Sequence, residues 1–256
     1  MRTQELWERR RAQFQGSNNP LIYTPGDNEW TDCHAQQGFP GGDPLERLPK
    51  LRSFFFADDR SFGRRTIALT RQSMAPQFAK YRENVRWDFG GITFLTLHVV
   101  GSNNGRGRTP EGDAEFAERN AADLAWLHAA FEHAARNNSR AVMIMQQANI
   151  FPALPPFPGN RKEEPSGFTE LREAIGRQAL AFAKPVVLAH GDSHYFRVEK
   201  PFMRRHAGEP IIDNFTRVEP FGSRFHHWIA VTVDAADPNV FTFRPRMVSA
   251  NMRLLQ

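Results

Sequence analysis

The sequence predicts a layered α/β fold built on a mixed β-sheet. Between about residues 20 and 190, short apolar runs typical of buried strands alternate with amphipathic helical segments. The rest of the chain alternates apolar and polar residues, as half-buried antiparallel strands do. This order favours a mixed sheet over a purely parallel one. The chain of 256 residues shows no internal repeat, and we expect one domain spanning 1–256.

The N-terminal part is expected to contain two helices and one short strand. The segment 1–19 carries a charged helix over residues 3–15, and Leu21–Thr24 is predicted to be a strand that Pro25-Gly26 ends. Asp43-Pro44 resembles a helix start, because proline is favoured in the first helical turn. Pro49 is expected to kink or shorten that helix.

The middle of the chain carries the clearest periodicity. Residues 60–90 have no clean period and are predicted to be loop and peripheral structure. The strands and amphipathic helices that follow are predicted, in chain order, at Ile92–Val100, 113–136, Ala141–Met145, 167–183 and Val186–Ala189.

The C-terminal third is predicted to be rich in strands after a loop. Residues 151–166 contain five prolines and are expected to form an exposed loop. The segment 195–245 is expected to be purely β, with strands at Tyr195–Glu199, Phe215–Glu219, Trp228–Val233 and Val240–Phe243.

Composition indicates a globular protein. The chain is 40% hydrophobic and 24% charged, and no apolar run is long enough to cross a membrane. The N-terminus lacks the apolar core of a signal peptide, so we expect a cytoplasmic protein. The lone Cys33 excludes an internal disulfide and a cysteine-cluster metal site. The net charge of +5 comes mostly from scattered arginines, which give no specific signal for nucleic acid.

Polar residues follow three of the predicted strands. They occupy Gly26–Glu29, Gly101–Asn104 and Gly191–His194, and such tips lie where open α/β sheets bind ligands. We expect Asp27, Asp192 and His194 to face one cavity and to share a metal ion, because carboxylate and imidazole donors suit divalent metals. The alternative is that these side chains only hydrogen-bond their own turns.

With these tips the chain resembles the calcineurin-like metallophosphoesterases. Gly26–Glu29 stands where the family has Gly-Asn-His-Asp/Glu, 146–149 where it has a lone His, and Gly191–His194 where it has Gly-His-x-His. The resemblance implies an αββα sandwich and metal-dependent hydrolysis of a phosphoester substrate. It also implies a binuclear centre of divalent ions such as Mn, Fe, Zn or Mg.

The resemblance assigns roles to individual residues. It implies Asp27, Gln147 (or Gln146), Asp192 and His194 as metal ligands, with Glu29 and His194 retained in type. Asn28 and Glu29 are the catalytic positions that the resemblance implies. Asn28 stands at the position of the family's catalytic His, but an amide is no general acid near neutral pH. His34 is therefore our candidate proton donor, with a surface histidine as the alternative reading.

Three further polar residues and one histidine complete the candidates. Ser102, Asn103 and Asn104 are expected either to bind substrate oxygens or to form a polar turn. His98 lies inside the predicted strand Ile92–Val100, and we expect it to be a core histidine with its hydrogen bonds satisfied.

Two family motifs are missing from the sequence. Only 25 residues precede Gly26, and they contain neither Asp-x-His nor Gly-Asp. We expect either a chain shortened at its N-terminus, lacking the first strands and any upstream export signal, or a relative that has lost catalysis. The rival interpretations are a non-catalytic phosphate- or nucleic-acid-binding module on the same scaffold, and a gene remnant without function.

Overall fold

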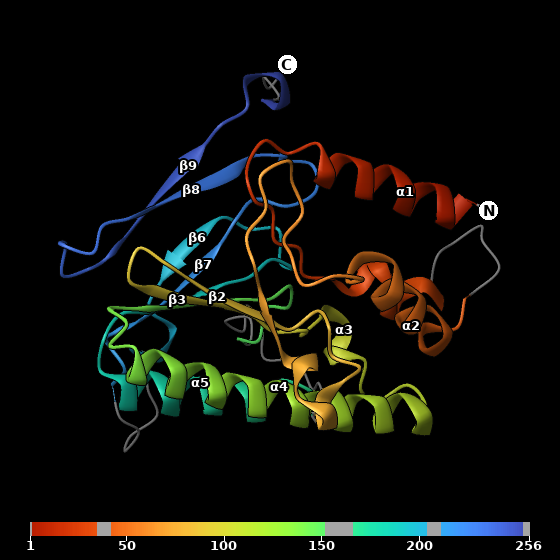
Figure 1. Ribbon diagram of the computed structural model, residues 1–256, viewed down its shortest axis with the longest axis horizontal. Coiled ribbons are helices and arrows are strands. Elements are labelled where there is room, and N and C mark those ends of the chain that lie inside the picture. Colours follow the sequence, from red (N-terminus) through yellow and green to blue (C-terminus); the bar gives the residue numbers. More distant parts are fainter. Residues whose placement is uncertain (1, 35–41, 152–165, 204–210, 253–256) are drawn as a thin grey trace, which may run out of the picture.

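A seven-stranded mixed sheet organises the computed structural model, which describes residues 2–34, 42–151, 166–203 and 211–252 (Figure 1). The strands lie in nearly the order of the chain. From one edge to the other they are β1 (Thr70–Arg71), β2 (Val85–Phe89), β3 (Ile92–Thr96), β4 (Val142–Met145), β5 (Val186–Ala189), β7 (Phe215–Glu219) and β6 (Arg197–Glu199).

The centre of the sheet is parallel and its edges are antiparallel. Strands β3, β4, β5 and β7 run in one direction, while β1, β2 and β6 pair antiparallel with their neighbours. Gly90 and Gly91 join β2 to β3 with positive φ angles of 59° and 76°, which a tight hairpin turn requires. The parallel strands need long crossovers, and helices supply them.

Two helices and a hairpin cover the two faces of this sheet. Helices α4 (Pro110–Arg136) and α5 (Thr169–Phe182) lie side by side on one face and enclose the larger apolar core (Figure 1). On the other face, β8 (Trp228–Val233) and β9 (Phe241–Arg246) form a two-stranded sheet that packs through Val240 and Phe241. The α/β class with a mixed sheet is therefore confirmed.

Two N-terminal helices pack against each other through aromatic rings. They are α1 (Arg2–Gln15) and α2 (Pro44–Phe55), and Trp7 of α1 contacts Phe55 of α2. The side chain of Asp43 accepts a hydrogen bond from the Leu45 amide and caps α2. Helix α2 continues past Pro49 to Phe55, because its buried face outweighs the hydrogen bond that proline removes.

Short helical turns complete the fold. Along the described part of the chain, five of them precede α4, one lies between β6 and β7, and one follows β9. They are η1 (Asp27–Glu29), η2 (Thr31–His34), η3 (Gln72–Met74), η4 (Pro76–Phe78), α3 (Gly101–Asn104), η5 (Pro201–Met203) and η6 (Ser249–Asn251). Among the helices that the structure describes, none is both long and apolar enough for a membrane span.

Several predictions of local structure were wrong. Leu21 forms only an isolated bridge with Phe62 instead of belonging to a strand. Residues 60–90 are not merely loop, since they contain β1 and β2; β2 escaped prediction because its exposed half breaks the apolar pattern. The C-terminal region is not purely antiparallel, because β7 is buried and pairs parallel with β5. The predicted loop at 151–166 falls almost wholly outside the described residues.

Candidate functional site

Three of the predicted strand tips meet at the carboxyl edge of the parallel strands. The tip after β4 is held between the other two, because the Gln147 amide donates to the Val99 carbonyl at 3.2 Å and the Gly191 amide donates to the Gln147 carbonyl at 2.9 Å. The Gly26–Glu29 turn joins this edge through Asp27. Segments separated by more than a hundred residues thus form one polar cluster, as expected for the ligand-binding edge of an open sheet.

A single amide links the two central carboxylates. Nε2 of Gln147 lies 3.2 Å from Oδ1 of Asp27 and 3.4 Å from Oδ1 of Asp192. Oε1 of the same side chain accepts a hydrogen bond from the Gly101 amide at 2.6 Å. Gln147 therefore orients both carboxylates, but it turns its nitrogen and not its oxygen toward the space between them.

Gly101 leaves room for these carboxylates. A Cβ atom added at this position would overlap Oδ2 of Asp27 and lie 2.7 Å from Oδ1 of Asp192. The two acids consequently approach the same point above the backbone where α3 begins. No residue with a side chain fits there without moving one of them.

The close approach of the Asp27 and Asp192 carboxylates is electrostatically unfavourable unless a positive charge compensates it. Burial raises the pKa of Asp27, and the negative charges of Asp32 and Asp192 raise it further, against hydrogen bonds from Asn28 and Gln147 that lower it. A cation between Asp27 and Asp192 would offset this repulsion, and carboxylate oxygens are donors that hard divalent ions prefer.

Asn149 fixes the other oxygen of Asp192, a role that sequence reasoning missed. Its backbone amide donates to Oδ2 of Asp192 at 3.1 Å, and its side-chain amide donates to Oγ of Ser193 at 2.7 Å. Arg217 on β7 donates to Oδ1 of Asn149 at 2.9 Å and pairs with Glu199 on β6. In the sequence, this role could have been inferred from the position of Asn149 at the end of the polar segment 146–149, which follows β4.

A left-handed turn follows β3 beside the carboxylates. Ser102, Asn103 and Asn104 have φ angles of 54°, 56° and 58°, a conformation in which each L-residue is strained. The buried Asn104 accepts hydrogen bonds from the Val100 amide at 3.2 Å and from Arg119 at 2.6 Å. It therefore serves the turn itself.

The other two residues of this turn also contact neighbouring loops. Oδ1 of Asn103 accepts a hydrogen bond from the Gly167 amide at 2.7 Å. Ser102 is exposed, and its hydroxyl donates to Asp32 at 2.7 Å. Of the three predicted substrate-binding residues, Ser102 alone presents an exposed side chain.

The predicted catalytic residues lie on the turns that carry Asp27. Oε2 of Glu29 accepts a hydrogen bond from the Gly26 amide at 2.8 Å and closes the turn, and burial raises its pKa. Asn28 is exposed and donates to Oδ1 of Asp27 from both its backbone and its side chain, at 2.8 and 3.3 Å. The backbone of His34 ends η2, and its side chain lies outside the described residues.

His194 is not brought to the two carboxylates. Its φ angle is 60°, and its ring lies so close to Gly222 that an added Cβ there would overlap it. Across the described parts of the chain, no three His, Cys, Asp or Glu side chains gather as a metal-binding group. The structure thus brings together Asp27, Gln147 and Asp192 of the predicted ligand set.

A buried network anchors the site loop to the segment that follows β3. Trp30 donates from Nε1 to Nε2 of His98 at 3.1 Å, and Nδ1 of His98 lies 2.6 Å from Oε1 of Glu83. Burial lowers the pKa of His98, so the imidazole is neutral with a proton on Nδ1. The expectation of a satisfied core histidine agrees with these contacts.

Comparisons with protein families, curated proteins and solved structures identify no relative of this chain. The chain matches no protein-family model, and neither a curated protein nor a solved structure is significantly similar to it. Any assignment of function therefore rests on the arrangement of Asp27, Gln147 and Asp192.

Proposed function

We propose that this chain is a metal-dependent phosphoester hydrolase in which Asp27 and Asp192 hold a divalent cation. The convergence of these two carboxylates above Gly101 carries the proposal. With oxygen donors alone, Mg²⁺ and Mn²⁺ fit the pair better than softer ions. When bound, such an ion activates water and stabilises charge on the displaced oxygen.

The surrounding side chains support this function by holding the carboxylates in place. Gln147 orients one oxygen of each, and the Asn149 amide holds the second oxygen of Asp192. The exposed hydroxyl of Ser102 is our candidate for contact with substrate oxygens. The order of the tips also supports a calcineurin-like type. A binuclear centre would need ligands besides Asp27 and Asp192.

Metal titration tests the proposal. We expect Mn²⁺ to bind the protein in calorimetry, and Asp27→Asn and Asp192→Asn each to weaken binding by about tenfold or more, because each removes a charged ligand. Asp213→Asn, at an exposed acid, is the matched control and should bind like the parent.

Without metal, Asp27→Asn should melt no lower than the parent, since it removes repulsion from Asp192.

Turnover of 4-nitrophenyl phosphate in the same samples separates the two candidate functions. Metal-dependent hydrolysis that both variants lose would support the hydrolase. Metal binding without hydrolysis, together with phosphate binding, would favour the non-catalytic phosphate-binding module on the same scaffold. Equal metal affinity in Asp27→Asn, Asp192→Asn and Asp213→Asn would refute the site.

A further inference from the structure

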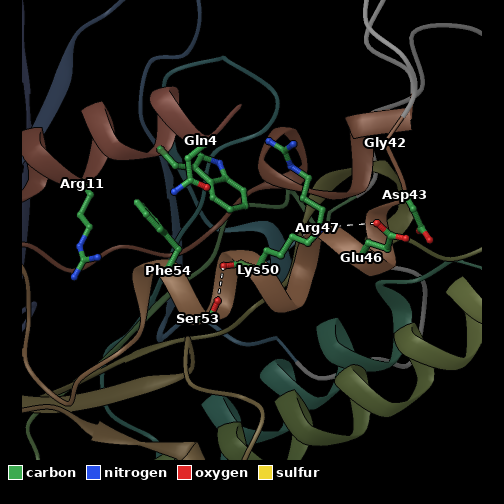
Figure 2. A pocket seen from close by; sticks show the side chains of 10 residues that line it. Gln4, Arg11, Gly42, Asp43, Glu46, Arg47, Lys50, Ser53 and Phe54 are labelled. Carbon is green, nitrogen blue, oxygen red and sulfur yellow. Dashed lines mark hydrogen bonds and ion pairs between the residues drawn. The ribbon is translucent and has the colours of Figure 1, made fainter. Parts of the chain in front are cut away.

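A pocket lies between helices α1 and α2 (Figure 2). Its volume is about 540 Å³, a size typical of sites for small organic ligands. Trp7 and Arg11 line it from α1, and Arg47, Lys50 and Phe54 line it from α2. Neighbouring residues within each set are three or four positions apart, so each set lies along one face of its helix. The lining shares no residue with the Asp27–Asp192 cluster.

Two arginines are stacked on the aromatic floor of this pocket. The Trp7 and Phe54 ring centroids are 5.8 Å apart. The guanidinium carbon of Arg47 lies 5.0 Å from the Trp7 ring centroid, and that of Arg11 lies 5.3 Å from the Phe54 ring centroid. Figure 2 shows Arg11 and Arg47 on opposite sides of Phe54. Stacking restricts both side chains, so less conformational entropy is lost when an anion binds.

The half-buried Arg11 and Arg47 differ from three buried arginines, each of which pairs with a carboxylate. Arg52 pairs with Glu83 at 2.7 Å, Arg119 pairs with Glu115 at 2.9 Å, and Arg217 pairs with Glu199. Within the described ranges, neither pocket arginine forms an ion pair with a carboxylate. Their guanidinium groups therefore lack the anionic partner that these three buried arginines have.

The nearby acids are engaged in other contacts. Glu46 pairs with Lys50 at 3.7 Å, and Asp43 accepts from the Leu45 amide at 2.8 Å. The Glu29 carboxylate bonds the Gly26 amide at 2.8 Å, while its carbonyl accepts from Nε of Arg47. This last contact fixes Arg47 against the turn that carries Asp27.

We propose that this pocket binds an elongated organic anion that carries two separate anionic groups, one at Arg47 and the other at Arg11. A guanidinium group matches phosphate and carboxylate oxygens with two parallel hydrogen bonds, so either chemistry fits. The separation of the two arginines by the aromatic floor selects a ligand whose charges are apart. This site does not depend on the proposed hydrolase activity.

Calorimetry in metal-free buffer at low ionic strength tests the pocket. The probes are inorganic phosphate, fructose 1,6-bisphosphate and suberate. We expect the bisphosphate to bind at least about tenfold more tightly than phosphate, because it engages both arginines. Arg11→Gln should remove this advantage, and Arg47→Gln should weaken both ligands about tenfold. Arg9→Gln, at an exposed position of α1, should match the parent.

The outcomes separate the ligand class from the site itself. Suberate binding as tightly as the bisphosphate indicates a dicarboxylate, and weaker suberate binding indicates a bisphosphate. No binding of fructose 1,6-bisphosphate or of suberate at millimolar concentration, or equal affinity in Arg11→Gln and Arg9→Gln, would overturn the proposal. Unchanged bisphosphate affinity in Asp192→Asn would show that the pocket is separate from the candidate metal site.

Discussion

At the scale of single residues, two buried carboxyl groups of one polar network behave in opposite ways. Burial raises the pKa of Asp123 to about 7, despite a 2.7 Å hydrogen bond from Asn84. Burial also acts on Glu83, but Arg52 and His98 outweigh it and lower the pKa to about 2. Between these values Glu83 is charged while Asp123 stays protonated. The charge of Arg52 and the hydrogen bonds that Glu83 receives, not burial alone, decide which acid ionises.

Asp123 is expected to make the protein less stable as the pH rises. Its folded pKa lies above its usual value of 3.8, so the folded state keeps the proton that the unfolded state loses, and stability falls between about pH 4 and pH 7. Asp123→Asn should remove this loss and gain up to about 4 kcal/mol over the parent by pH 8.

Urea unfolding from pH 4 to pH 8 measures this effect. The gain of Asp123→Asn over the parent should grow with pH and level off above pH 7. Asp213→Asn is exposed and serves as the control, with no such trend. A gain that stays constant across the range would show that the change acts through packing and not through ionisation.

The sequence predicted part of the site residue by residue. Asp27, Gln147 and Asp192 were expected to meet, and they do, because glycines and polar residues at strand ends reveal the sheet edge. The orientation of His194 toward Gly222 depends on a backbone φ of 60°, which no residue pattern specifies. The side-chain amide of Gln147 is likewise oriented by the backbone amide of Gly101, which lies in a segment 46 residues away in the chain.

At the scale of elements, the fit between the start of α3 and the two carboxylates depends on one glycine. Gly101→Ala places a methyl group against Asp27 and Asp192 and should push them apart. We expect Mn²⁺ affinity to fall about tenfold or more, with the far-ultraviolet circular dichroism unchanged. Gly191→Ala is the matched control, because its Cβ would lie an ordinary 3.6 Å from the Gln147 carbonyl oxygen. Equal losses in the two variants would contradict this explanation.

Elements whose apolar pattern is complete were predicted best. The bounds of β5, β7 and β8 agree with the sequence prediction. Each strand is an apolar or alternating run that is followed by residues typical of turns. Strand β2 was missed because exposed residues at its end remove the pattern. The parallel pairing of β7 could not be predicted, because its partner β5 lies beyond a long connection.

At the scale of the whole molecule, stability should be distributed unevenly between the two sheets. All five residues of β3 are buried, and apolar clusters lie on both faces of the central strands. The β8–β9 hairpin is exposed along much of its length. Hydrogen exchange followed by mass spectrometry should therefore show amides of β3, β4 and β5 exchanging at least about tenfold more slowly than those of β8 and β9. Equal protection of both sheets would contradict this expectation.

The order of strands in the sheet has a consequence for synthesis on the ribosome. From β1 to β5, each new strand pairs with the one made just before it, so a growing chain can extend the sheet one strand at a time. The single reversal is at the far edge, where β6 lies outside β7. Residues 197–199 must leave the ribosome unpaired and wait for residues 215–219 before they join the sheet. Assembly during translation should therefore pause at this edge, after the strands that carry the candidate site are in place.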